Sequence, residues 1–219
     1  MKYKCLVLDH DDTVVNSSQS IHYPAFLHTL NTLRPNEDLL SFEDFNHHCF
    51  IYGFYHLCKT RYQFTDDEME IEYKIWKSHT QSKQADPFDG WKELLLKFKE
   101  LGGKIVVVSY SESNEIRRDY VDHFGFEPDL IFAHDHGKDK LKPNPYPIYK
   151  LIEELKISQD SILVIDDMPV GYEMAVNANV DFIWAQWAYY DERLDQHITK
   201  SSYKSLDNIN DLYEILQIT

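Results

Sequence analysis

Two aspartates, Asp9 and Asp11, follow the first apolar run of the chain and are separated by a single residue. At the end of a strand, alternate side chains point to the same side, so these two carboxylates are expected within a few ångströms of each other. Two carboxylates about 4 Å apart repel by roughly 4 kcal/mol at an effective dielectric constant near 20. A cation or a shared proton must relieve this repulsion, which suggests metal binding or acid–base chemistry. An Asp-rich turn whose acids accept backbone hydrogen bonds is the alternative interpretation.

More polar residues stand near the ends of later apolar segments. Ser109 ends one apolar run, the pair Asp166 and Asp167 ends another, and Lys142 lies between them in a Lys-Pro-Asn-Pro segment. Each has an ordinary interpretation when taken alone. A serine or an acidic pair after a strand often caps a helix, and a lysine before proline is often a solvated loop residue. Their occurrence together in one chain favours a shared site.

The segments that carry these residues alternate between apolar strands and amphipathic helices. Strands are predicted at 5–8, 104–109, 130–134, 161–167 and 181–185, and helices at 87–101, 111–125, 171–177 and 208–216, with a further helix ending at 155. This alternation predicts an α/β fold with a doubly wound parallel sheet. In such sheets ligands bind beyond the carboxyl ends of the strands, where one crevice can collect all of these polar residues.

The segment 17–84 differs in character, because it is rich in aromatic residues and histidine and lacks a strongly apolar strand-like run. Ser41 followed by Asp44, and Thr65 followed by Glu68, resemble capping boxes at helix starts. We therefore expect three or four short helices that form a small separate unit, inserted into a core domain made of residues 1–16 and 85–219.

Composition limits the class of protein. The 219 residues are 43% hydrophobic and carry a formal net charge of −15, which disfavours nucleic acid and anionic membranes as partners. No apolar run approaches the roughly 20 residues that span a bilayer, and the chain starts without a signal-peptide pattern, so a cytoplasmic protein is expected. The three cysteines, Cys5, Cys49 and Cys58, are interpreted as reduced thiols, and the chain as a monomer or weak homodimer.

Together the polar segments resemble the haloacid dehalogenase-like superfamily of phosphohydrolases. That family begins with DxDx(T/V), here residues 9–13, and continues with a strand ending in Ser or Thr, here Ser109. A lysine in KPxP follows, here Lys142, and then an acidic pair, here Asp166 and Asp167. All four motifs occur in the family's order. The resemblance implies a Rossmann-like core with a small α-helical cap at 17–84, as in the β-phosphoglucomutase and phosphoglycolate phosphatase-like branch.

The resemblance also implies a mechanism, hydrolysis of a small phosphorylated metabolite through an aspartyl-phosphate. Asp9 would be the nucleophile, and Asp11 would protonate the leaving group and then deprotonate the attacking water. Thr13 and Ser109 would supply hydroxyl and nearby backbone donors to the phosphoryl oxygens, and Lys142 would supply the positive charge that balances nucleophile and phosphate.

A Mg²⁺ cofactor is implied by the same resemblance. Asp9, Asp167 and the backbone carbonyl of Asp11 would hold the ion among oxygen ligands. Asp166 would be either a further ligand or a hydrogen-bond acceptor behind the ligands.

Substrate contacts are expected from the cap and from the loop after Ser109. Most cap side chains coat its surface or fill its core, so these contacts are hypotheses for individual residues. The residues expected to contact substrate, besides Ser109 and Lys142, are Tyr110, His47, His48, Tyr52, Lys59 and Arg61.

Two other functions stay open. A phosphomutase of the β-phosphoglucomutase type would pass the phosphoryl group to a second hydroxyl, and a non-catalytic binding protein would keep only the fold. Asp11 argues against dehalogenases and phosphonate-cleaving members of the family, which lack an acid there. The threonine at position 13 is typical of the phosphatases, whereas the mutases tend to have valine at this position. Asp12 replaces a common glycine, at a position whose backbone conformation glycine adopts more readily.

Overall fold

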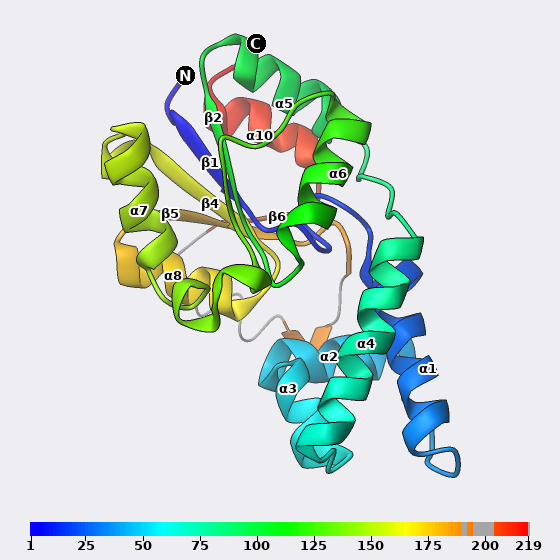
Figure 1. Ribbon diagram of the computed structural model, residues 1–219. Coiled ribbons are helices and arrows are strands. Elements are labelled where there is room, and N and C mark those ends of the chain that lie inside the picture. The colour runs from blue at the N-terminus through cyan, green and yellow to red at the C-terminus, as the bar shows by residue number, and fades with distance from the viewer. Residues whose placement is uncertain (190–191, 195–203, 219) are drawn as a thin grey trace.

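A six-stranded parallel sheet forms the centre of the protein, whose computed structural model describes residues 1–189, 192–194 and 204–218 (Figure 1). The strand order is β3-β2-β1-β4-β5-β6, and every neighbouring pair is parallel. The strands are β1 (Cys5–Leu8), β2 (Lys104–Val108), β3 (Leu130–Phe132), β4 (Ile162–Asp166), β5 (Asp181–Ala185) and β6 (Lys204–Leu206). The sequence predicted the first five in this list and missed β6.

Helices cover both faces of the sheet, as the doubly wound prediction requires (Figure 1). One face packs against α5 (Trp91–Glu100), α6 (Ser113–Phe124) and α10 (Leu212–Leu216). The other packs against α7 (Tyr146–Leu155) and α8 (Pro169–Ala178). Short helical turns complete this part of the chain: His134–His136, Lys138–Lys140, Gln159–Ser161, Glu192–Leu194 and Ile209–Asp211. The predicted fold class is confirmed.

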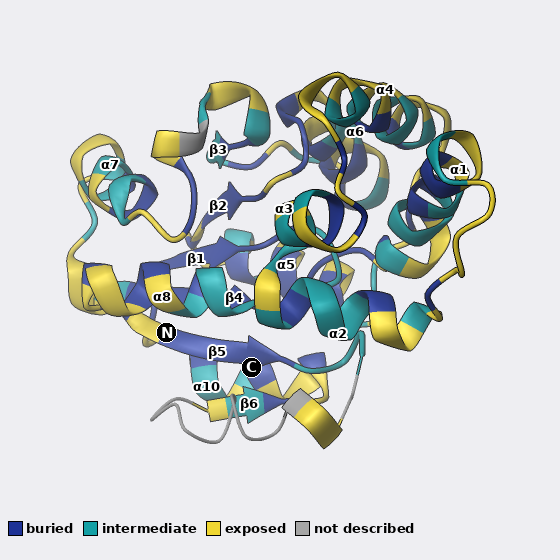
Figure 2. Cartoon of the chain, turned by 90° about the horizontal axis from the view of Figure 1, so that it is seen from below, coloured by how far each residue is buried: buried dark blue, intermediate teal, exposed yellow. Residues whose placement is uncertain are grey.

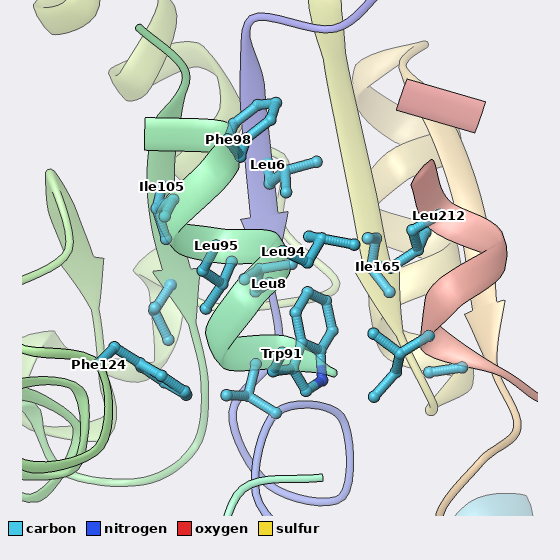
Figure 3. Packing of buried hydrophobic residues seen from close by; sticks show 14 of the residues in the cluster. Leu6, Leu8, Trp91, Leu94, Leu95, Phe98, Ile105, Phe124, Ile165 and Leu212 are labelled. Atoms are coloured by element: carbon cyan, nitrogen blue, oxygen red, sulfur yellow. The ribbon is translucent and has the colours of Figure 1, made fainter. Parts of the chain in front are cut away.

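Strand β1 is an uninterrupted apolar run because both of its faces are buried. Leu6 and Leu8 belong to the core on the α5 side, where Figure 3 shows them against Trp91, Leu94 and Phe98. The alternate residues Cys5 and Val7 belong to the core on the opposite face. Because both faces of the strand are covered, all four of its residues are fully buried. The next residues of the chain emerge at the carboxyl edge of the sheet.

The segment after β1 is helical, as expected. It contains η1 (Ser18–His22), α1 (Tyr23–Leu33), α2 (Phe42–Tyr52), α3 (Phe54–His56), η2 (Leu57–Arg61) and α4 (Asp66–Ser82). Both predicted helix starts are confirmed: Ser41 accepts from the backbone N–H of Asp44, and Thr65 and Glu68 form a complete capping box. A separate hydrophobic cluster that includes Phe26 fills the segment.

This helical segment lies beyond the carboxyl ends of the strands (Figures 1 and 2). Its entering and leaving linkers run side by side, because the N–H of Asn16 donates to the carbonyl of Asp86 and Val15 pairs with Pro87. The ring of Phe50 in α2 lies 6.1 Å from that of Trp184 in β5. The boundaries 17–84 for a separate domain stay a prediction. No helix in the described part of the chain combines the length and apolar character that crossing a bilayer requires.

One acid inside the helical segment is expected to make stability depend on pH. Glu72 of α4 is buried, and burial raises the pKa of its carboxyl to about 7. Between pH 4.5 and 7 the folded chain then holds more protons than the unfolded chain, so the free energy of unfolding falls as pH rises. At pH 8, Glu72→Gln is expected to raise the free energy of unfolding by about 1–3 kcal/mol, because the amide removes the cost of burying a charged carboxylate.

Urea unfolding of this variant and of the wild type at pH 5 and pH 8 measures the effect. The exposed neighbour Glu70 supplies the control Glu70→Gln, which is expected to leave the pH dependence unchanged. If the free energy of unfolding changed equally between pH 5 and pH 8 in wild type and Glu72→Gln, the raised pKa of Glu72 would be contradicted.

Candidate active site

A buried lysine joins two acids at the carboxyl edge of the sheet. The Nζ atom of Lys142 lies 2.8 Å from Oδ1 of Asp9, just after β1, and 2.6 Å from Oδ2 of Asp166, at the end of β4. All three side chains are almost completely shielded from solvent. Burial opposes a charge on Lys142, but the two carboxylates outweigh it and hold the pKa of Lys142 above its ordinary value. Two sequence motifs separated by more than 130 residues therefore meet at one ammonium group.

A third acid stands beside this pair. One carboxylate oxygen from each of Asp9, Asp166 and Asp167 can be chosen so that all lie within 4.8 Å of one another. Burial, and then the charges of Asp9 and Asp166, hold the pKa of Asp167 well above its ordinary value. Lys142 offers one positive charge to three carboxyl groups, so a further cation would relieve the repulsion that remains when all three are ionised. Its all-oxygen donor set suits a hard divalent ion such as Mg²⁺.

Helix α8 is built to approach Asp166 closely. The backbone N–H of Met168 donates to Oδ1 of Asp166 at 2.8 Å. Gly171, in the first turn of α8, lies against the same carboxyl group, and a Cβ at this position would collide with it. Asp166 is thus held between Lys142 and the start of the helix. These contacts favour the interpretation of Asp166 as a hydrogen-bond acceptor behind the predicted metal ligands.

Asp11 is oriented by three hydrogen bonds. Its Oδ2 accepts from Ser111 Oγ at 2.6 Å and from Ser109 Oγ at 3.3 Å, and its Oδ1 lies 2.9 Å from Nε2 of His22. Burial would raise the pKa of Asp11, but His22 and the Ser111 hydroxyl stabilise the carboxylate and hold that pKa far below its ordinary value. The sequence predicted Ser109 but missed Ser111 and His22. Ser111 could have been suspected, because it lies two residues beyond Ser109.

Thr13 differs from expectation in where its hydroxyl points. The sequence predicted a contact with phosphoryl oxygens, but the side chain is fully buried and donates to Oδ1 of Asp167 at 3.2 Å. Its carbonyl accepts the indole N–H groups of Trp91 and Trp187 at 2.8 and 2.9 Å. In this structure Thr13 stabilises a predicted metal ligand and ties the loop to two tryptophans.

Comparison with known proteins decides the family. Residues 6–185, which include every one of the four motifs, match the haloacid dehalogenase-like hydrolase family. The chain belongs to the haloacid dehalogenase-like hydrolases. It is 24% identical over 227 residues to the pyrophosphatase PpaX of Bacillus cereus strain G9842, an alignment that covers 99% of this chain and 97% of that protein.

Solved structures show the same hydrolase fold. A predicted phosphoglycolate phosphatase from Haemophilus somnus 129PT superposes with a TM-score of 0.78 at 18% identity, covering 99% of both chains. A predicted phosphatase from Clostridium acetobutylicum gives a TM-score of 0.78 at 17% identity over 100% of both chains.

In this hydrolase the aspartate that replaces the common glycine has a structural explanation. Asp12 has a φ of 56°, the left-handed conformation for which glycine is favoured. Its Oδ1 accepts from the backbone N–H groups of Ser17 and Ser18 at 3.2 and 2.9 Å. These bonds offset the conformational cost and fasten the entering linker of the helical segment to the loop that carries Asp9 and Asp11.

The structure places the residues predicted to contact substrate in different surroundings. Tyr110 lies at the site, since its hydroxyl donates to the carbonyl of Lys142 and its ring centroid is 5.8 Å from that lysine's Nζ. The contacts described for the other predicted residues are internal to the helical segment. His48 and Tyr52 pack on His56, Lys59 pairs with Asp66, and Arg61 lies over Tyr62, while His47 is half-buried in α2.

Residues of α4 contact the core instead. The hydroxyl of Tyr73 donates to Glu112, in the loop after β2, and Lys77 forms an ion pair with the same carboxylate at 2.7 Å. Trp76 reaches the core indirectly, because it donates to His22 of the same segment, which contacts Asp11. The sequence pattern gave no indication of these contacts, because they depend on how the helical segment sits on the hydrolase core.

Proposed function

We propose that the protein is a Mg²⁺-dependent phosphatase that hydrolyses a small phosphomonoester through an aspartyl-phosphate intermediate. The observation that carries the proposal is the buried Lys142 held between Asp9 and Asp166, beside an acidic group with an excess of negative charge. A phosphoryl group and a divalent cation together would satisfy this arrangement. The names of the relatives, pyrophosphatase and predicted phosphoglycolate phosphatase, agree with phosphate chemistry.

In the proposed first step, the carboxylate of Asp9 attacks phosphorus while the bond to the leaving oxygen breaks. Asp11 is a carboxylate in this structure and must gain a proton when the phosphomonoester binds. It gives this proton to the leaving oxygen, so that an alcohol departs. Lys142 stays beside Asp9 and offsets the negative charge of the phosphoryl group. The Ser109 hydroxyl gives up its 3.3 Å hydrogen bond to Asp11 and donates to a phosphoryl oxygen instead. Asp11 then takes a proton from the water that attacks the aspartyl-phosphate, which releases inorganic phosphate and restores Asp9.

Asp9, Asp167 and the backbone carbonyl of Asp11 are the proposed Mg²⁺ ligands. The bound ion would supply positive charge that brings the carboxylate and the phosphate together and offsets charge in the transition state. We further propose that segment 17–84 is a cap that excludes water from the site, on the basis of its place beyond the strand ends and its contacts with the loop after β2. A cytoplasmic location and a monomeric or weakly dimeric state remain predictions.

Phosphate release from a panel of phosphomonoesters and inorganic pyrophosphate tests this function. With Mg²⁺ we expect turnover of at least one compound, a loss of about 100-fold or more after chelation with EDTA, and recovery when Mg²⁺ is returned. Chelator-insensitive hydrolysis would exclude the metal mechanism. Turnover that needs a sugar bisphosphate would favour the phosphomutase, and absence of both turnover and Mg²⁺ binding would favour the non-catalytic binding protein.

A further inference from the structure

We infer that His22 and Trp76 form a positioning pair that orients Asp11 for proton transfer and makes that orientation depend on the place of the helical segment. The inference rests on the proposed phosphatase function. Neither residue belongs to a motif in the sequence. Both come from the helical segment, His22 from η1 and Trp76 from α4, whereas Asp11 belongs to the core.

The hydrogen bonds fix where the imidazole proton lies. The indole Nε1 of Trp76 lies 3.0 Å from Nδ1 of His22, and an indole N–H can only donate. Nδ1 is therefore the acceptor, and the proton of the neutral ring lies on Nε2. That atom is 2.9 Å from Oδ1 of Asp11, to which it donates. The two rings are nearly parallel, with an interplanar angle of 17°, which holds the imidazole in this direction.

The two oxygens of Asp11 are bound by different parts of the molecule. Oδ2 accepts from Ser111 and Ser109 of the core, and Oδ1 accepts from His22 of the helical segment. The plane of the carboxyl group is thus determined by two contacts on the Oδ2 side and one on the Oδ1 side. If the segment moved away, Oδ1 would lose its donor and the carboxyl group could rotate about its hydrogen bonds to the core.

Helix α4 is held in place on the same core loop that carries Ser111. The ring of Tyr73 lies 5.8 Å from that of Trp76 in a stacked arrangement, and its hydroxyl donates to Glu112, the residue after Ser111. Lys77, one residue beyond Trp76, pairs with Glu112 at 2.7 Å. These contacts connect the place of Trp76 to the loop that holds the other side of Asp11. The pair therefore positions the acid only when α4 is docked.

The positioning role can be tested by comparing substrates whose leaving groups differ in their need for a proton. Protonation by a positioned acid typically contributes about 10²–10⁴-fold when the leaving group is a poor one, such as an alkoxide. A nitrophenolate departs without a proton and needs the acid much less. Loss of the positioning pair should therefore slow hydrolysis of an alkyl phosphate far more than that of an aryl phosphate. A merely structural loss would slow both equally.

The experiment compares glycerol 2-phosphate with p-nitrophenyl phosphate in wild type, His22→Leu, His22→Gln and Trp76→Phe, all with Mg²⁺. kcat/KM is used because it includes departure of the leaving group whichever later step limits kcat. We expect His22→Leu to lose about 10–100-fold on the alkyl ester and less than about 5-fold on the aryl ester. His22→Gln should recover most of the loss, because its amide can donate to Asp11 and accept from Trp76.

Trp76→Phe should show the same selectivity to a smaller degree. His28→Leu replaces an exposed histidine of α1 and serves as the control that keeps both rates. A ring ¹⁵N NMR spectrum supplies a readout independent of activity: His22 should be protonated on Nε2 in wild type and lose this preference in Trp76→Phe.

Equal losses on both esters, or no loss in His22→Leu, would overturn the inference while leaving the phosphatase intact. An Nδ1-protonated His22 in the wild-type spectrum would overturn it as well. If wild type hydrolysed neither ester nor any other phosphate compound, the proposed function itself would fail.

Discussion

Replacing Asp9 with asparagine is expected to lower kcat by about 10³-fold or more while the fold is retained. An amide of the same shape cannot form the aspartyl-phosphate, because it lacks the anionic oxygen that attacks phosphorus. The substitution also removes one of the two carboxylates on Lys142, but Asp166 remains as its partner at 2.6 Å. The buried ammonium therefore keeps a counter-charge, and the strand and its core on both faces stay intact.

Phosphate release measures the loss of activity, and circular dichroism measures whether the fold is retained. Acid quenching during turnover should trap a phosphorylated chain in wild type and none in Asp9→Asn. Asp207→Asn changes an exposed aspartate and is the matched control, expected to keep full turnover. A variant that kept a tenth of the wild-type rate would show that Asp9 is not the nucleophile.

Replacing Lys142 with methionine is expected to lower both activity and the free energy of unfolding. Methionine keeps most of the side-chain volume but leaves Asp9 and Asp166 buried without their counter-charge. Removing one partner of a buried ion pair typically costs about 3–5 kcal/mol. Burial and the charge of Asp9 already raise the pKa of Asp166 to about 7 against the opposing effect of Lys142, so loss of the lysine raises it further.

The sign of the pH dependence follows. A carboxyl group whose folded-state pKa is raised is neutral at low pH and is penalised as pH rises through that pKa. The destabilisation of Lys142→Met should therefore be larger at pH 8 than at pH 5. Urea unfolding at both values measures it, with Lys140→Ala, an exposed lysine of the same loop, as the control. Equal stability of Lys142→Met and wild type at pH 8 would show that the lysine does not compensate the two acids.

The fold and the centre of the site were predictable because their causes are local in the sequence. A strand buried on both faces needs an unbroken apolar run, and the polar residues that follow such runs in parallel order must meet at one edge. Lys142 does contact both Asp9 and Asp166 at this edge. Strand β6 escaped prediction because it has only three residues, of which the lysine is exposed and the serine half-buried.

Contacts of the helical segment were not predictable, because they depend on the orientation of one unit against another. His22 and Trp76 are 54 residues apart and share no motif, yet they are hydrogen-bonded beside Asp11. Lys59 and Arg61 have the charge that suits a phosphorylated ligand, but their described contacts are with Asp66 and Tyr62 of their own segment. Residue type alone does not say which way a surface side chain faces.

The placement of the tryptophans gives the enzyme an internal optical probe. All four indoles of the chain contact the candidate site or the helical segment: Trp91 and Trp187 bind the carbonyl of Thr13, Trp76 binds His22, and Trp184 lies against Phe50 of α2. Intrinsic fluorescence should therefore change in intensity or wavelength when an anion or a cation enters, without any attached dye. Removing one indole at a time would separate movement of the loop that carries Asp9 and Asp11 from movement of the helical segment.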